Sequence, residues 1–197
     1  MKKAIFIVTI LFVAVISTAC INNIAVQELN NAAKTYMEKG DYPAAIERLE
    51  SSIELDGTIY ETHYNLGVAY IDVKQYEKAI DSLNNAIRIN SKYADSYYTL
   101  AVAQEKLADS LIETPEGVGL TTDEEGNVTS TIPASETYSN ISQEIRERMI
   151  EGYLSSISNY KKYNDMVNSK QKTEEVNAHI IEMEKVLLKL GYSGSGY

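Results

Sequence analysis

Apolar residues recur three and four positions apart through most of the chain. Residues at this spacing share one face of a helix, so the pattern predicts amphipathic helices. The first pair covers residues 26–59, with faces formed by Ala32, Ala33 and Tyr36, and by Ala45, Leu49, Ser52 and Ile53. Between the faces, Gly40-Asp41 predicts a turn, Pro43 suits the opening turn of the second helix, and Gly57 is expected to end it.

The same pattern returns after 34 residues. Shifting residues 26–59 onto residues 60–93 gives identities at Asn31/Asn65, Tyr36/Tyr70, Tyr42/Tyr76, Ala45/Ala79, Ile46/Ile80, Leu49/Leu83 and Ile53/Ile87. A period of 34 residues with a helix–turn–helix pattern resembles the tetratricopeptide repeat. The positions that carry the resemblance are Leu66, Gly67, Tyr70, Ala79, Leu83 and Ala86. The small residues among them allow paired helices to approach closely, while Leu83 and the tyrosines fill the space between.

A third unit begins at residue 94 and is interrupted. Its first helix is expected over residues 94–111 and its second over residues 152–166. The intervening insertion, residues 113–140, is read either as a disordered loop or as a β-hairpin, because alternating apolar residues flank the turn at Asp123–Asn127. A last amphipathic helix over residues 169–190 has the pattern of a terminal cap, with Val176, Ile180, Met183, Leu187 and Leu190 on its apolar face.

The predicted fold is therefore all-α. It is a short solenoid of the tetratricopeptide type, with about three helix–turn–helix units, a C-terminal capping helix and a loop or β-hairpin insertion in the third unit. The expected organisation is a signal peptide 1–19, an anchor segment 20–25, a helical domain 26–190 and a flexible tail 191–197. Within the domain we expect repeats 26–59, 60–93 and 94–112 plus 141–166, the insertion 113–140 and the cap 169–190.

The first residues have the pattern of a targeting segment. Lys2 and Lys3 precede an apolar run that is too short to cross a bilayer, and small residues lead to Cys20. Ser17 to Cys20 resembles the lipobox of bacterial lipoproteins. The resemblance implies cleavage before Cys20, attachment of a diacylglyceryl group to its thiol, and anchoring in the membrane of the cell envelope, on the periplasmic or cell-surface face. The alternative is an ordinary cleaved signal that leaves Cys20 as a free or buried thiol.

Composition removes several classes of function. The chain of 197 residues carries 18 basic and 28 acidic residues, a net charge of −10, which argues against a nucleic-acid partner. One cysteine and two histidines rule out a disulfide framework and leave little for zinc or iron chemistry. No phosphate-binding glycine loop, nucleophile elbow or zinc-protease motif occurs. We expect His63 to be packed and His179 to be solvated, and we expect no catalytic residues, no metal, no cofactor and no enzymatic activity.

The family resemblance places a groove along the first helix of each unit. Its positions in this chain, called the predicted groove below, are Asn30, Lys34, Glu61, Tyr64, Asn65, Val68, Asp72, Asp95, Tyr98 and Val102. Family members that clamp a C-terminal carboxylate use Lys, Asn and Arg, but Asp95 and Thr99 stand where a Lys and an Arg would be needed. The exposed tyrosines and acids favour a basic or aromatic extended segment, although Tyr64 and Tyr98 could instead only coat the surface.

These observations favour a lipid-anchored module or assembly scaffold that binds another envelope protein. The alternative is a structural protein that self-associates through the tyrosine-rich helix around Tyr153–Tyr163, which makes a homo-oligomer a second expectation. An enzyme with its site on the insertion is a third and weaker reading.

Overall fold

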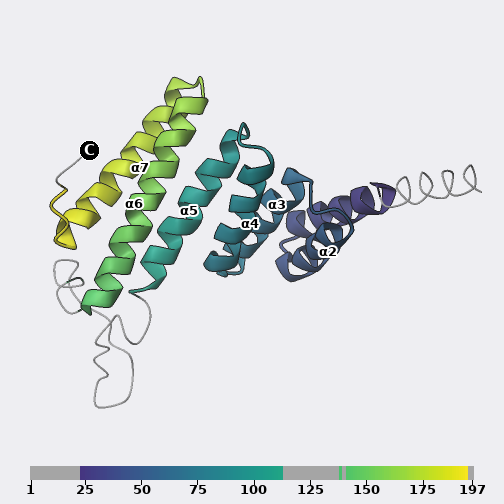
Figure 1. Cartoon of the computed structure of the whole chain (residues 1–197), viewed down its shortest axis with the longest axis horizontal. Helices are drawn as coiled ribbons and strands as arrows, with labels where there is room; N and C mark the ends of the chain where they lie inside the picture. The colour runs from purple at the N-terminus through teal and green to yellow at the C-terminus, as the bar shows by residue number, and fades with distance from the viewer. Residues whose placement is uncertain (1–22, 113–137, 139–140, 195–197) are drawn as a thin grey trace, which may run out of the picture. The chain divides into compact units, whose positions relative to one another are not determined.

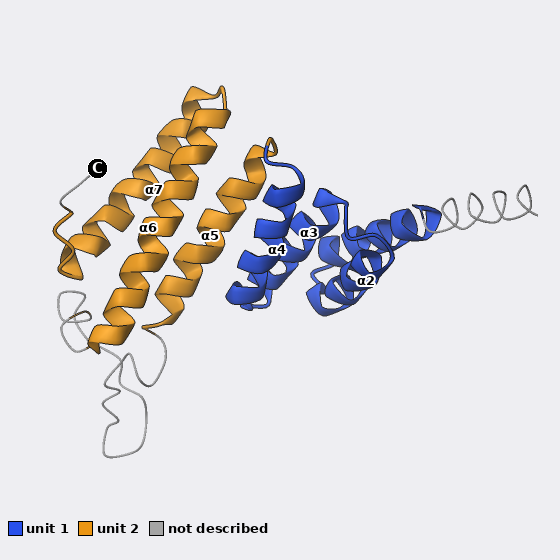
Figure 2. Cartoon of the chain, in the orientation of Figure 1, with its two compact units in different colours: residues 1–91 blue, residues 92–197 orange. Residues whose placement is uncertain are grey.

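The computed structural model describes residues 23–112, 138 and 141–194 (Figure 1). Within these residues the secondary structure is helical and includes no strand, which confirms the predicted all-α class. The chain divides into two compact units, Met1–Ser91 and Lys92–Tyr197 (Figure 2). The boundary falls two residues before the predicted end of the second repeat. No helix in the described ranges combines the length and the apolar character that crossing a bilayer requires.

Unit 1 contains a helix over residues 23–38, α2 (Tyr42–Leu55), α3 (Tyr60–Asp72) and α4 (Tyr76–Ile89). Helix α3 packs against both α2 and α4. Asp41 caps α2 by accepting a hydrogen bond from the Ala44 amide at 3.3 Å, and Pro43 lies in the first turn, as the sequence predicts. The helix ends at Leu55, two residues before the expected stop at Gly57, because the chain becomes extended at Asp56.

The core of unit 1 depends on small residues where helices meet. Leu49, Leu83 and the alanines at 33, 45, 79 and 86 have no exposed surface. A Cβ built on Gly67 of α3 would lie 2.5 Å from Cγ of Leu83, which is closer than carbon atoms can approach. Glycine at this position therefore lets α3 and α4 reach their observed separation.

Unit 2 contains α5 (Ala94–Ser110), α6 (Gln143–Met166) and α7 (Lys170–Lys189). Helix α6 begins at Gln143, so the expected start at residue 152 was wrong. Ser142 caps the helix by accepting from the Ile145 amide, and the buried Ile145 and Met149 continue its apolar face ahead of Gly152. Glycine often breaks helices, but here it lies inside one.

Gly152 lies where α6 packs closely against α5. A Cβ at Gly152 would lie 3.0 Å from Cβ of Ala108, and one turn further along α6 the buried hydroxyl of Ser156 donates to the Ala101 carbonyl at 2.8 Å. Small residues on both helices therefore allow close approach, as in unit 1. Helix α7 packs on α6 through the five apolar residues expected for the cap, all of which are buried.

The insertion lies outside the described residues, apart from Tyr138, so its two readings remain predictions. The carbonyl of Tyr138 accepts a hydrogen bond from Arg146 of α6 at 2.9 Å. Arg146 also donates to the carbonyl of Leu190, the last residue of the expected cap, at 3.0 Å. The start of α6 and the end of α7 are therefore held by the same side chain.

Candidate functional site

Seven residues of the predicted groove lie in unit 1 and three lie in unit 2. In unit 1, α3 carries five of them on one face. Glu61 and Asp72 are exposed, whereas Tyr64, Asn65 and Val68 are half-buried. The two others, Asn30 and Lys34, lie on the helix over residues 23–38, where Lys34 is exposed. The negative charge of Asp72 raises the pKa of the Tyr42 phenol.

Asn30 has a structural role that the sequence interpretation missed. Its amide nitrogen donates to the Val26 carbonyl at 3.0 Å and to the Ser52 hydroxyl at 2.9 Å. Its amide oxygen accepts from the Thr62 hydroxyl at 3.0 Å. Ser52 and Thr62 have no exposed surface. Asn30 therefore joins three helices of unit 1 through buried polar groups, and its hydrogen-bonding atoms are used inside the protein.

Replacing Asn30 by alanine is expected to lower the free energy of unfolding by about 1–3 kcal/mol, because the buried hydroxyls of Ser52 and Thr62 would each lose a partner. Chemical denaturation followed by circular dichroism measures the change. The exposed neighbour Asn31 provides the control, and Asn31→Ala is expected to change stability by less than about 0.5 kcal/mol. Equal stability of the two variants would mean that this network contributes nothing.

In unit 2, the groove residues Asp95, Tyr98 and Val102 follow one another along one face of α5. Tyr98 is 41% exposed, which makes it one of the few large apolar side chains with so much open surface among the described residues. Its ring meets the ring of Tyr160 at 5.4 Å in an edge-on arrangement and the ring of Tyr163 at 5.2 Å. Tyr98 is thus half open to solvent and fixed from below by two tyrosines of α6.

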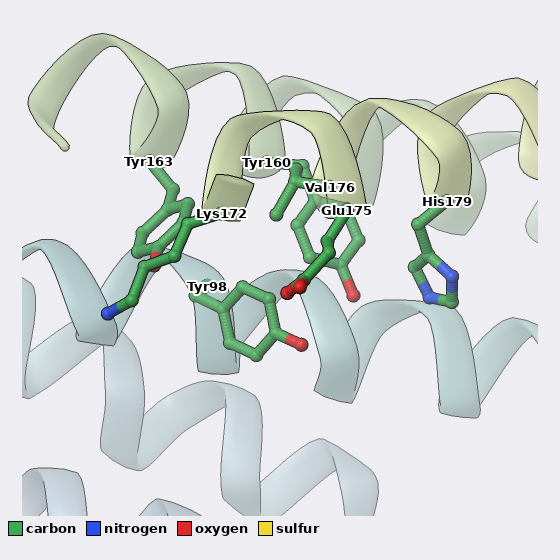
Figure 3. Close-up of a pocket in the computed structure, with 7 residues that line it drawn as sticks. All are labelled: Tyr98, Tyr160, Tyr163, Lys172, Glu175, Val176 and His179. Atoms are coloured by element: carbon green, nitrogen blue, oxygen red, sulfur yellow. The ribbon is translucent and has the colours of Figure 1, made fainter. Parts of the chain in front are cut away.

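A pocket of about 300 Å³ surrounds Tyr98. We call it the unit-2 pocket; it is lined by Tyr98 of α5, Tyr160 and Tyr163 of α6, and Lys172, Glu175, Val176 and His179 of α7 (Figure 3). The α6 tyrosines are almost fully buried, at 0% and 4% exposure, and they form the floor. The charged residues of α7 are exposed and form the rim. This arrangement of an aromatic floor and a polar rim is typical of binding surfaces.

Glu105 of α5 connects the floor of the pocket to its rim. Its Oε2 accepts a hydrogen bond from the Tyr160 hydroxyl at 3.3 Å and another from Nε2 of His179 at 2.8 Å. The Glu105 side chain is only 17% exposed. Burial raises the pKa of the Tyr160 phenol far above its ordinary value, and the negative charge of Glu105 is the second-largest cause. A largely buried carboxylate therefore lies behind the pocket, bonded to two of the residues that line it, Tyr160 and His179.

His179 differs from its prediction. We expected a solvated residue, and its side chain is indeed 49% exposed, but the ring pairs with Glu105 and meets the Tyr160 ring edge-on at 5.4 Å. His63 is packed, as expected: it is 7% exposed and its Nε2 lies 3.0 Å from the Gly57 carbonyl oxygen.

The tyrosine-rich face of α6 is not a surface for pairing between copies. Tyr153, Tyr160 and Tyr163 are all buried inside unit 2. The hydroxyl of Tyr153 donates to Asp109, and burial raises the pKa of this phenol as well. The predicted route to self-association through Tyr153–Tyr163 was therefore wrong, because these rings already form the contact of α6 with its neighbours in unit 2.

The sequence did not lead us to expect that residues of α6 and α7 line a pocket with Tyr98. The heptad-like spacing of Lys172, Glu175 and His179 beside Val176 contained the signal, since it places them on one helical face. Because we predicted α7 only as a cap, we expected these polar residues to face solvent without forming a site. Cys20 lies outside the described residues. Among the residues that are described, no group of acids, histidines or cysteines is arranged to hold a metal ion.

Comparisons with known proteins agree with this architecture. A model of the tetratricopeptide repeat matches residues 60–93, and a second model for this repeat matches residues 33–73. Comparison with curated proteins finds no relative by sequence.

Solved structures show the same fold at low sequence identity. The tetratricopeptide domain of Arabidopsis OM64 is similar with a TM-score of 0.56 and 10% identity, over 82% of this chain and 98% of that chain. The second tetratricopeptide domain of human RPAP3, in complex with an HSP70 peptide, is similar with a TM-score of 0.54 and 13% identity, over 83% of this chain and 98% of that chain. The TPR2B domain of yeast Sti1, in a complex with pHsp70, is similar with a TM-score of 0.52 and 14% identity, over 83% of this chain and 98% of that chain. The chain therefore carries tetratricopeptide repeats within residues 33–93, and its all-helical fold resembles that of tetratricopeptide solenoid domains.

Proposed function

We propose that this protein is a non-enzymatic binding module that holds an extended segment of a protein partner. The unit-2 pocket carries the proposal, because Tyr98 presents an open aromatic side chain that is already fixed in place by Tyr160 and Tyr163. A rigid tyrosine loses little conformational entropy on binding and offers both apolar area and a hydroxyl, so it is a frequent centre of binding energy.

The similar structures support a protein ligand. Human RPAP3 and yeast Sti1 bind HSP70-derived peptides or partners through domains of this fold. Their ligand does not transfer directly to this chain, since Asp95 and Thr99 stand where a carboxylate clamp needs cations. The fold supports the class of partner, a protein segment, and this chain's own side chains determine which segment it binds.

We further propose that Cys20 carries a lipid anchor that holds the module at the bacterial cell envelope, where another envelope protein is its partner. The sequence from Ser17 to Cys20 is the support for this step. Metabolic labelling with a radioactive fatty acid tests it: the wild-type chain incorporates label and Cys20→Ser does not. Equal labelling of both would rule out the anchor.

Replacing Tyr98 by alanine is expected to lower partner binding at least about tenfold, because the substitution removes the open ring and leaves the floor of the pocket uncovered. Site-specific photo-crosslinking measures this in the native membrane, with the photoreactive residue in place of the exposed Asp95, one turn from Tyr98 on α5. A distinct protein adduct is expected, and Tyr98→Ala should remove most of it.

The same photoreactive residue in place of Lys106 provides the matched control. Lys106 is also exposed on α5 but does not line the pocket. Adducts of equal yield from both positions, or an adduct that survives Tyr98→Ala unchanged, would show that the partner does not bind at the pocket.

Self-association is the second candidate, and one observation favours it. Ile181 and Leu188 of α7 are 50% and 69% exposed, and they lie seven residues apart on one face of the helix. Sedimentation of the full chain in detergent over a range of concentrations distinguishes the candidates. Association that Leu188→Ser removes would favour the structural role, whereas a strict monomer would exclude it.

A further inference from the structure

The unit-2 pocket gathers oxygen atoms above an aromatic floor. In Figure 3 the carboxylate of Glu175 and the hydroxyl oxygens of Tyr98 and Tyr160 are directed toward the middle of the pocket. The ammonium group of Lys172 is instead directed toward one end, beyond Tyr163. The centre of the pocket is therefore electronegative even though one cation lines its rim.

Glu105 strengthens this field from beneath. Its carboxylate is mostly shielded from water, and both of its hydrogen bonds, from Tyr160 and His179, reach the same atom, Oε2. A charge that is shielded from solvent acts over a longer range than an exposed one. Asp95 is exposed one turn before Tyr98 on the same face of α5 and adds a third acidic group near Tyr98.

The rings favour the same kind of occupant. The Tyr98 ring centroid lies 5.4 Å from that of Tyr160 and 5.2 Å from that of Tyr163, and all three rings line the pocket. Tyrosine faces attract cations, and a lysine or arginine side chain also buries its aliphatic stem against such rings. An acidic side chain would be repelled by Glu105 and Glu175, and a purely apolar one would shield the Glu175 carboxylate from water without neutralising its charge.

We propose that the unit-2 pocket binds a positively charged side chain, a lysine or arginine, of the partner's extended segment. The stem lies across Tyr98 and Tyr163, and the charged head lies beside the carboxylate of Glu175, with the Glu105 carboxylate behind the Tyr160 hydroxyl. This inference rests on the proposed function and adds the chemical class of the segment that the pocket selects.

Binding of short labelled peptide pools to the full chain in detergent tests the charge directly. The pools have random flanking residues and one fixed central residue, either arginine, lysine, glutamate or citrulline, which has the shape of arginine but no charge. Fluorescence anisotropy is expected to give binding for the arginine and lysine pools that is at least about tenfold tighter than for citrulline.

Two substitutions on α7 connect this preference to the pocket. Glu175→Gln is expected to weaken binding of the arginine pool at least about fivefold, because the substitution removes one carboxylate charge and keeps the side-chain shape. Glu174→Gln is the matched control: this neighbour on the same helix is 67% exposed, pairs with Lys170 and does not line the pocket. It should leave binding unchanged, and circular dichroism should be the same for both variants.

Equal binding of the arginine and citrulline pools, tighter binding of the glutamate pool, or equal effects of the two glutamine variants would overturn the charge preference. The proposed function would survive each of these results as long as the crosslink near Tyr98 persists. Failure of every pool to bind, together with loss of the crosslink, would overturn both.

Discussion

Replacing Leu83 by alanine is expected to lower the free energy of unfolding of unit 1 by about 2–5 kcal/mol. Leu83 has no exposed surface, and its side chain fills the space beside Gly67 where α3 and α4 meet. The substitution would leave a cavity that the rigid helix pair cannot close. Chemical denaturation followed by circular dichroism measures the loss. Leu55→Ala, at a leucine that is 43% exposed on α2, is the control and is expected to cost much less.

A substitution at Gly67 of α3 tests the same contact between α3 and α4. A Cβ at this position would lie 2.5 Å from Cγ of Leu83, so Gly67→Ala is expected to destabilise unit 1 by about 1–3 kcal/mol despite the better helix propensity of alanine. The double variant with Leu83→Ala should be more stable than the sum of the two losses predicts, because the new methyl group occupies part of the cavity. Strict additivity would show that the two side chains do not compete for one space.

Replacing Tyr160 by alanine is expected to lower the free energy of unfolding of unit 2 by about 3–5 kcal/mol. The Tyr160 ring has no exposed surface and contacts the rings of both Tyr98 and His179. Its loss also removes the floor of the unit-2 pocket, so peptide binding should fall with stability. Hydrogen exchange over α5, α6 and α7, compared with exchange in unit 1, locates the change.

Tyr160→Phe separates packing from the hydrogen bond in this prediction. Phenylalanine keeps the ring and loses only the bond from the hydroxyl to Glu105, so the expected cost is about 1 kcal/mol. If Tyr160→Phe destabilised unit 2 as strongly as Tyr160→Ala, the polar contact and not the ring would hold α6 in place.

Helix positions and the apolar faces followed from the sequence because local rules govern them. The turn at Gly40-Asp41, the apolar face of each predicted helix and the five apolar residues of the predicted cap depend on neighbours within a few positions. The start of α6 was predicted wrongly for the complementary reason. Gly152 has the pattern of a helix boundary in isolation, but inside α6 it lies where a Cβ would crowd Ala108 of α5.

The candidate site was predicted less well than the fold. Asn30 was assigned to the groove by its repeat position, yet its amide holds Ser52 and Thr62 through contacts with residues 22 and 32 positions away. Tyr98 was identified as a candidate, but neither the two tyrosines beneath it nor Glu175 was. A repeat alignment assigns each position a role by analogy, and it carries no information about which neighbours complete a hydrogen-bond network or a pocket.

The sequence by itself determined that this protein is helical and repetitive, because hydrophobic periodicity and small residues at fixed spacing act over one or two helical turns. Only the tertiary structure decided which polar groups are used internally and which remain open. Glu105, Tyr160 and His179 are separated by 55 and 74 residues along the chain and meet only when α5, α6 and α7 pack together. The pocket is a property of that packing, since burial creates both its aromatic floor and the shielded charge beneath it.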